Sequence, residues 1–192
     1  MTSTLRSIFT CVFFIIFFST STYAQPKKGQ FITVSAGLGL SALDYEDDAA
    51  LTGHGFYVHG EYVYGITKWF GLRPYAAIII TSPDKNGNQP GQPTYQISSK
   101  ALMIGGKARI CAPIPWIAPF FEVGLGASVG KFETITPTSN LEKSGILPHV
   151  PVTIGLALGP KHNVELAFSY YYHSSVDQMC GAVEAGFTFP LD

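Results

Sequence analysis

Charge is scarce in this sequence of 192 residues. Asp, Glu, Lys and Arg make up only 13% of it, about half of the roughly 25% found in an ordinary globular chain. A surface that faces water needs charged side chains for solubility. The shortage therefore indicates that much of the outer surface faces something other than water. The formal net charge of −1 also lacks the basic excess of nucleic-acid-binding proteins, and we expect no nucleic-acid partner.

The sequence also lacks an apolar run long enough for a membrane-spanning helix, which needs about 20 residues. The longest apolar block, residues 8–18, follows Arg6 and precedes small polar residues that end at Ala24. This order of a basic start, a short apolar core and a small-residue cleavage site is typical of a secretory signal peptide. We predict a signal peptide over residues 1–24 and one exported domain over residues 25–192, with a retained anchor as the alternative.

Helical periodicity is missing after residue 25. Apolar and polar residues alternate instead, in runs separated by Gly, Pro and Asn, and this pattern is typical of β-strands. We predict eight strands, at residues 30–43, 55–66, 71–81, 95–110, 118–132, 152–158, 164–173 and 179–189.

The predicted connections differ in length in a regular order. Long polar segments, "DYEDDAALTGH", "SPDKNGNQPGQPT" and "ETITPTSNLEKSGILPHVP", alternate with the short turns "TKWF", "CAPIPWI" and "GPKHN". Only the last connection, around "SSVDQ", is brief where a long one is expected. Long loops at one end and tight turns at the other are typical of outer-membrane barrels. The sequence therefore predicts an all-β fold, an eight-stranded antiparallel up-and-down transmembrane β-barrel.

The two faces of the predicted strands differ in composition. One face is apolar and free of charge, as in Phe121, Val123 and Leu125, and the other carries glycine and the charged residues. A soluble exported barrel that binds a ligand would turn the apolar face inward, and this remains an alternative. We favour the opposite arrangement, because small residues in a narrow interior make room for a few large ones, while lipid covers the apolar face.

The predicted interior therefore contains a charge network. Its members are Glu61, Arg73, Lys107, Arg109, Glu122, Glu165 and Glu184. If the hairpins are tight, Glu61 lies directly opposite Arg73, and Lys107 directly opposite Glu122, as cross-strand neighbours. We favour a structural plug that fills the lumen, since side chains just fill an eight-stranded barrel. A gate, in which ion pairs exchange partners to open a narrow pore, is the alternative.

Aromatic residues gather beside two of the short turns. They are Trp69, Phe70, Trp116 and Phe120. Because aromatic rings, Trp and Tyr above all, prefer the membrane–water interface, we predict that these four lie there.

The last strand ends in "GFTFPLD", with Val183, Ala185, Phe187 and Phe189 in alternation. Together with the signal peptide, the eight runs and the uneven connections, this resembles small outer-membrane β-barrel proteins of the OmpA-like or OmpX-like type. The resemblance implies a monomeric, porin-like protein of the Gram-negative cell envelope, located in the outer membrane. It implies contact with outer-membrane lipid and lipopolysaccharide, and with the assembly machinery that reads the final strand. Residues 190–192 after the last aromatic depart from that pattern.

A second resemblance concerns the end of the seventh run. Lipid A deacylases are eight-stranded outer-membrane barrels with a His-x-Ser motif in strand seven and a later Glu, and His173, Ser175 and Glu184 match it. The resemblance implies Ser175 as nucleophile, His173 as base and Glu184 as the group that orients the imidazole. Val176 stands where that family has Asn, and alternation turns His173 inward. We therefore expect a non-enzymatic protein, structural, adhesive or a narrow pore, and keep the deacylase as the alternative.

Metal and cofactor sites are not predicted. The five histidines fall on different connections and depths, and the acidic "DYEDD" segment lacks a calcium-loop pattern. The ligand of the long loops is not named by any motif.

Overall fold

The computed structural model describes residues 28–43, 52–83, 96–135, 140–173 and 178–191. The predicted signal peptide lies outside this range. No helix in the described part of the chain is long and apolar enough to cross a bilayer.

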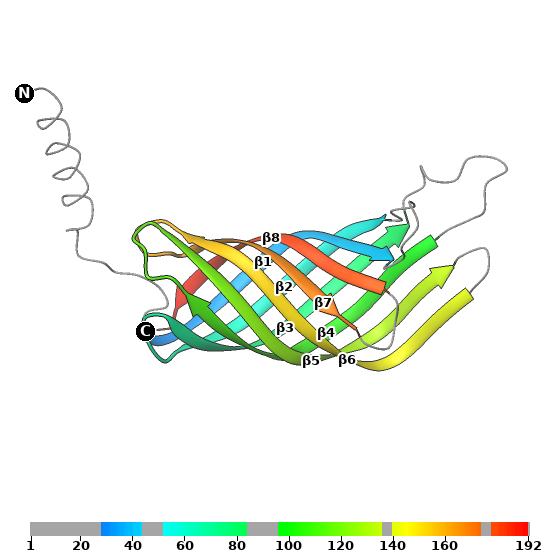
Figure 1. The fold of residues 1–192 in the computed structure, drawn as a ribbon, viewed down its shortest axis with the longest axis horizontal. Coiled ribbons are helices and arrows are strands. Elements are labelled where there is room, and N and C mark those ends of the chain that lie inside the picture. Colours follow the sequence, from blue (N-terminus) through cyan, green and yellow to red (C-terminus); the bar gives the residue numbers. More distant parts are fainter. Residues whose placement is uncertain (1–27, 44–51, 84–95, 136–139, 174–177, 192) are drawn as a thin grey trace, which may run out of the picture.

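Eight antiparallel strands form a closed barrel, as predicted (Figure 1). They are β1 (Gly29–Leu43), β2 (Thr52–Gly65), β3 (Phe70–Pro83), β4 (Gln96–Cys111), β5 (Ile117–Ile135), β6 (Asn140–Leu158), β7 (Val164–Tyr172) and β8 (Gln178–Pro190). Each strand pairs with its neighbour in sequence, and β1 pairs with β8 to close the barrel. The all-β, up-and-down architecture expected from the alternation is therefore confirmed.

The two ends of the barrel differ. The turns at 66–69, 112–116 and 159–163 lie at one end with the last described residue, and we call this the turn end (Figure 1). The strands that flank residues 44–51, 84–95, 136–139 and 174–177 meet at the opposite end, the loop end.

Strand β6 begins much earlier than the sequence indicates. We expected a strand over residues 152–158 after a long connection, and this is wrong, because β6 pairs with β5 from Asn140 onward. Gly145, Pro148 and Pro151 obscure the alternation there. The ladder to β5 is interrupted around Pro151, which has no N–H to donate. Most of the predicted third long loop is therefore a two-stranded extension at the loop end.

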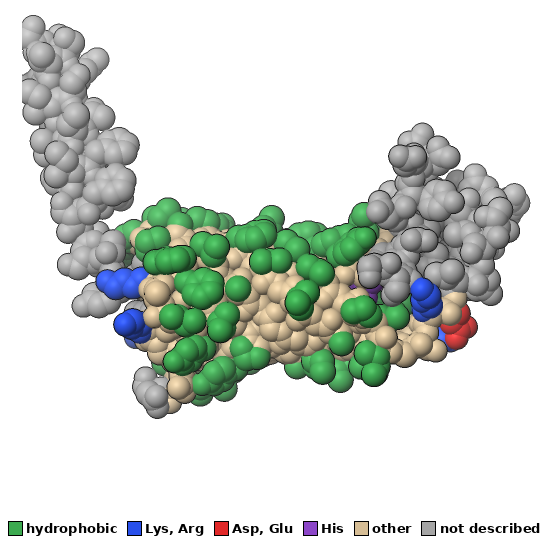
Figure 2. All heavy atoms as spheres, turned by 60° about the horizontal axis from the view of Figure 1, so that its bottom comes forward, with side chains coloured by type: hydrophobic (Ala, Val, Ile, Leu, Met, Phe, Trp, Pro, Cys, Tyr) green, Lys and Arg blue, Asp and Glu red, His purple; other side chains and the backbone are tan. Residues whose placement is uncertain are grey.

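The outer wall is an apolar band. On β3 the outward residues run from Phe70 to Ile80, which for tilted strands is a height of roughly 25 Å, the usual height of a lipid-facing band. Between the exposed Lys68 at the turn end and Lys100 at the loop end, no charged side chain of the described strands points outward. Figure 2 shows the same arrangement, with hydrophobic side chains over the wall and charged ones toward the ends.

The interior is layered from the turn end to the loop end. The inward residues of β3 give the order, with charged Arg73 first, then Tyr75, then the apolar Ala77 and Ile79, and finally the hydroxyl of Thr81. Each of these side chains is buried. Side chains of the other strands join these layers unevenly, and a small apolar cluster of Cys111, Ala118, Phe120 and Ala157 lies at the turn end. The lumen thus holds a charged layer, an aromatic layer, an apolar layer and the linked hydroxyl groups of Ser41, Thr81 and Ser99.

Candidate functional site

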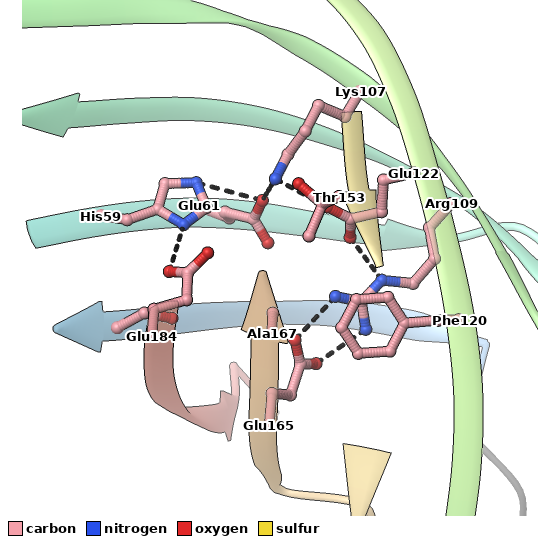
Figure 3. A pocket seen from close by; sticks show the side chains of 11 residues that line it. His59, Glu61, Lys107, Arg109, Phe120, Glu122, Thr153, Glu165, Ala167 and Glu184 are labelled. Atoms are coloured by element: carbon pink, nitrogen blue, oxygen red, sulfur yellow. Dashed lines mark hydrogen bonds and ion pairs between the residues drawn. The ribbon is translucent and has the colours of Figure 1, made fainter. Parts of the chain in front are cut away.

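The charged layer is the only concentration of buried charge in the described residues, and we call it the lumen cluster. Its members are His59 and Glu61 of β2, Arg73 of β3, Lys107 and Arg109 of β4, Glu122 of β5, Glu165 of β7 and Glu184 of β8. None is more than 5% exposed. The seven residues predicted for the interior network are thus all inside the barrel and in contact with one another through ion pairs or through His59. Figure 3 shows the cluster without Arg73.

Glycine gives these long side chains the room to cross the lumen. Gly124 and Gly126 occupy inward positions on β5, between Glu122 and Ser128. A β-carbon at Gly126 would lie 2.5 Å from the hydroxyl oxygen of Tyr75 and from Nε2 of His149. The alternation of glycine with large residues, visible in the sequence, therefore has a steric cause.

The arginines tie the two halves of the barrel together. Arg109 donates from Nη1 and Nη2 to the two oxygens of Glu165, at 2.8 and 2.6 Å, and from Nε to Glu122 at 2.5 Å. Arg73 donates to Glu61 at 2.5 Å and to Glu165 at 3.1 Å. Bidentate, charge-assisted hydrogen bonds of this kind are the strong ones, and here they join β2, β3, β4, β5 and β7.

Lys107 bridges two carboxylates. Its Nζ lies 2.6 Å from Glu61 Oε1 and 2.6 Å from Glu122 Oε2. The ammonium also lies 5.3 Å from the centre of the Tyr75 ring, within the range of a cation–π contact.

The expected cross-strand register of these pairs is wrong by two residues. Glu61 is opposite Tyr75 rather than Arg73, and Lys107 is opposite Gly124 rather than Glu122. The hairpin between β2 and β3 is centred on Lys68 rather than Thr67, and within it Thr67 accepts a hydrogen bond from the Phe70 amide at 2.9 Å. The ion pairs form nevertheless, along the diagonal, because long charged side chains reach that far.

His59 is a member of the cluster that the sequence did not single out. Its Nε2 lies 3.2 Å from Glu61 Oε1, and its Nδ1 lies 3.1 Å from Glu184 Oε2. The signal that could have found it is parity, since His59 stands two residues before Glu61 and therefore shares its face.

Above the cluster lies a hydrogen-bonded layer of tyrosines and histidines. The hydroxyl groups of Tyr57 and Tyr171 are 2.5 Å apart, and Tyr75 bonds to Nε2 of His149. Ser128 Oγ lies 2.8 Å from His149 Nδ1 and 2.8 Å from His173 Nε2. Both ring nitrogens of His149 are thus engaged within the barrel.

The three candidate catalytic residues are not assembled in the described residues. His173 is buried and points into the lumen, where its ring packs 4.9 Å from that of Phe132. Glu184 is opposite Ala167, six residues from His173 along β7, or about 20 Å at the usual rise of a strand. The Glu184 carboxylate contacts His59 and Ser169 instead. Ser175 lies outside the described residues.

Three of the four predicted interface aromatics lie on the outside. Trp69 and Trp116 are 51% and 63% exposed at the turn end, and Phe70 is half-buried beside Trp69. Phe120 corrects the prediction, because it points inward and its ring stacks 3.5 Å from the guanidinium carbon of Arg109. Since its neighbour Phe121 faces out, alternation requires Phe120 to face in.

The cluster fills the lumen almost completely. The space left between its side chains is about 10 Å³ for the centre of a water molecule, which is room for about one water. Toward the loop end the lumen is filled by Phe132, Met103 and Ile79, all fully buried. No three His, Cys, Asp or Glu side chains of the described chain are arranged to hold a metal ion.

Neither a protein-family model nor a curated protein matches the sequence. Solved structures do resemble the barrel. Neisserial surface protein A (NspA) aligns with a TM-score of 0.59 at 15% identity, over 85% of this chain and 98% of that chain. Ail, the attachment invasion locus protein of Yersinia pestis, aligns at 0.48 and 17% identity, over 85% and 100%. The outer membrane enzyme PagL aligns at 0.46 and 16% identity, over 83% and 99%.

Similarities at this level of identity concern the fold alone. The closed antiparallel topology, the apolar outer band and the alignment with NspA all point to the same architecture. The chain has the fold of the small eight-stranded outer-membrane β-barrels.

Proposed function

We propose that this chain is a non-enzymatic outer-membrane β-barrel protein of a Gram-negative cell envelope, with a structural or adhesive role and a closed lumen. The lumen cluster acts as a plug that fixes the register of the strands. The residues at the loop end make any contact with partners outside the cell.

One observation carries the proposal, namely the separation of apolar and charged side chains between the two sides of the barrel wall. Exposed apolar side chains cover the outside over roughly 25 Å, while every charged side chain of the described strands at that depth is buried inside. A soluble ligand-binding barrel would need the reverse distribution and a hollow interior. The exposed Trp69 and Trp116 at the turn end agree with a membrane–water interface.

The closed lumen favours a plug over a pore. The charged layer leaves space for about one water, and the lumen beyond it, filled by Met103, Ile79 and Phe132, contains no described Asp, Glu, Lys or Arg side chain that could replace the hydration of an ion. Opening a path would require breaking several buried ion pairs together, since each arginine contacts more than one carboxylate.

Fractionation of cells that express the full chain tests the membrane assignment. We expect the protein in the outer-membrane fraction, and we expect its migration in detergent gels to change on heating, as folded barrels unfold. Recovery in the soluble periplasmic fraction would contradict the proposal. A variant with Ile104→Lys, which places a charge on the lipid face, is a matched control and should insert less well by about 2–4 kcal/mol.

Conductance and lipid analysis test the role. Purified protein in planar bilayers should give no steady single-channel current, and lipid A should have the same mass with the protein and with its Ser175→Ala variant. Regular current steps would favour the narrow pore. A Ser175-dependent loss of an acyl chain from lipid A would favour the deacylase.

A further inference from the structure

The permanent charges of the lumen cluster do not balance. Four carboxylates, Glu61, Glu122, Glu165 and Glu184, face three bases that are cationic at neutral pH, Arg73, Lys107 and Arg109. A net negative charge buried in a filled lumen is costly, because the cavity beside it has room for only about one water to solvate it. One further positive charge, or one further proton, is therefore required.

His59 is placed to supply it. One ring nitrogen faces Glu61 Oε1 at 3.2 Å and the other faces Glu184 Oε2 at 3.1 Å. A neutral imidazole has one N–H donor and one acceptor nitrogen, whereas an ionised carboxylate can only accept. The Nδ1 contact with Glu184 has hydrogen-bond geometry, whereas Nε2 faces Glu61 at ion-pair distance without it. A ring protonated on both nitrogens is attracted to both carboxylates, whereas a neutral ring would turn a lone pair toward one of them.

The neighbours of His59 on the other strands leave Glu184 with no other cation. Lys107 of β4 shares Glu61 with His59, and the rings of Tyr57 and Tyr75 lie 5.8 and 5.7 Å from the imidazole. Among the described residues, His59 is the only base within ion-pair distance of Glu184, which otherwise accepts a hydrogen bond from Ser169 at 2.7 Å.

We propose that His59 is the fourth cation of the lumen cluster, an imidazolium that neutralises Glu184 and ties β2 to β8 beside the closing seam of the barrel. The barrel therefore holds one proton on the His59 ring, and its stability depends on that proton. Loss of this proton at high pH leaves the Glu184 carboxylate without a cation, so the folded barrel becomes less stable as the pH rises. The proposal concerns the interior and does not depend on what the loop end binds.

Three variants test the charge count. His59→Asn leaves four carboxylates against three bases and should raise the unfolding equilibrium constant about a hundredfold, the effect of breaking a buried pair. Glu184→Gln leaves three carboxylates and three bases when His59 is neutral. It should therefore destabilise the barrel less than His59→Asn does. The double variant has three carboxylates and three bases. Adding Glu184→Gln to His59→Asn should therefore recover much of the stability that His59→Asn loses. Equal stability of His59→Asn and the natural chain, or a double variant worse than His59→Asn, would overturn the proposal.

Nitrogen NMR of the natural chain, labelled at histidine and folded in detergent micelles, tests the same point without any variant. We expect His59 to show two protonated ring nitrogens at pH 7.5, with the signal of a neutral ring appearing only in base. Over the pH range in which the neutral ring appears, the unfolding midpoint of the natural chain should fall, whereas that of the double variant should not. A neutral His59 at pH 7.5 would place the proton on Glu184 and refute the assignment of the cation to His59.

Discussion

Arg109 provides the sharpest test of the lumen cluster as a plug. Arg109→Met removes three charge-assisted hydrogen bonds, two to Glu165 and one to Glu122, but keeps an apolar stem against Phe120. Both carboxylates keep a cationic partner in this variant. Arg73 remains 3.1 Å from Glu165. Glu122 in turn keeps the ammonium of Lys107 at 2.6 Å.

The expected cost follows from this partial loss. Removing one partner of a buried ion pair typically costs 3–5 kcal/mol, and the remaining cations place Arg109→Met near the lower end, about 3 kcal/mol. At room temperature this corresponds to an increase of the unfolding equilibrium constant of about a hundredfold. Urea unfolding in lipid vesicles measures it, with the fluorescence of Trp69 and Trp116 as the signal, since these are the two tryptophans of the chain.

Lys131→Met is the matched control. Lys131 lies 2.5 Å from Glu133 and 2.9 Å from Glu142, distances as short as those of Arg109, but its side chain is 48% exposed. Water already solvates these charges, so we expect no measurable change in the unfolding midpoint. If Arg109→Met and Lys131→Met unfold at the same urea concentration, burial is not what gives the cluster its strength, and the plug hypothesis fails.

Two further predictions concern the same interior. Exchanging Lys107 and Glu122 by the double substitution Lys107→Glu and Glu122→Lys should not restore the stability lost in the single variants, because the new carboxylate would lie beside Glu61; full recovery in a heat-dependent gel shift would contradict this. Gly126→Ala should destabilise the barrel by about 1–3 kcal/mol, since its β-carbon meets backbone and ring atoms within 2.6 Å, whereas Gly106→Ala, which meets nothing within 4 Å, should be neutral; equal urea midpoints would refute the steric argument.

Alternation was enough to predict the fold and the inward charges. The seven charged residues predicted to face the interior do so in the structure, because side-chain direction depends only on whether a position is odd or even along its strand. A register shift of two residues, such as that between Glu61 and Arg73, leaves every side chain on the same face. Which charges lie inside could therefore be predicted while their partners could not.

The remaining errors have local causes. Register depends on hairpin shape, and the residue on which the hairpin between β2 and β3 is centred is a detail of backbone geometry. The first part of β6, before residue 152, was missed because Pro148 and Pro151 usually mark loops, yet the barrel accommodates Pro151 where the ladder to β5 is interrupted. His59 was missed because parity with Glu61 places it inside but does not show that its ring lies between two carboxylates.

The layering of the lumen separates stability from recognition. The lumen cluster lies toward the turn end, and the aromatic and apolar layers stand between it and the loop end. A molecule bound at the loop end meets these layers first. The described polar contacts that cross them run from Tyr75 through His149 and Ser128 to His173 and include no ion pair, so we expect a charge lost from the cluster to have little effect on the loops. Substitutions in the cluster should change the free energy of unfolding and leave loop-end binding intact. Substitutions in the β5–β6 extension around Lys131 and Glu142 should change loop-end binding and leave the free energy of unfolding intact. A cluster variant that alters binding to cells at unchanged stability would show that the layers are coupled.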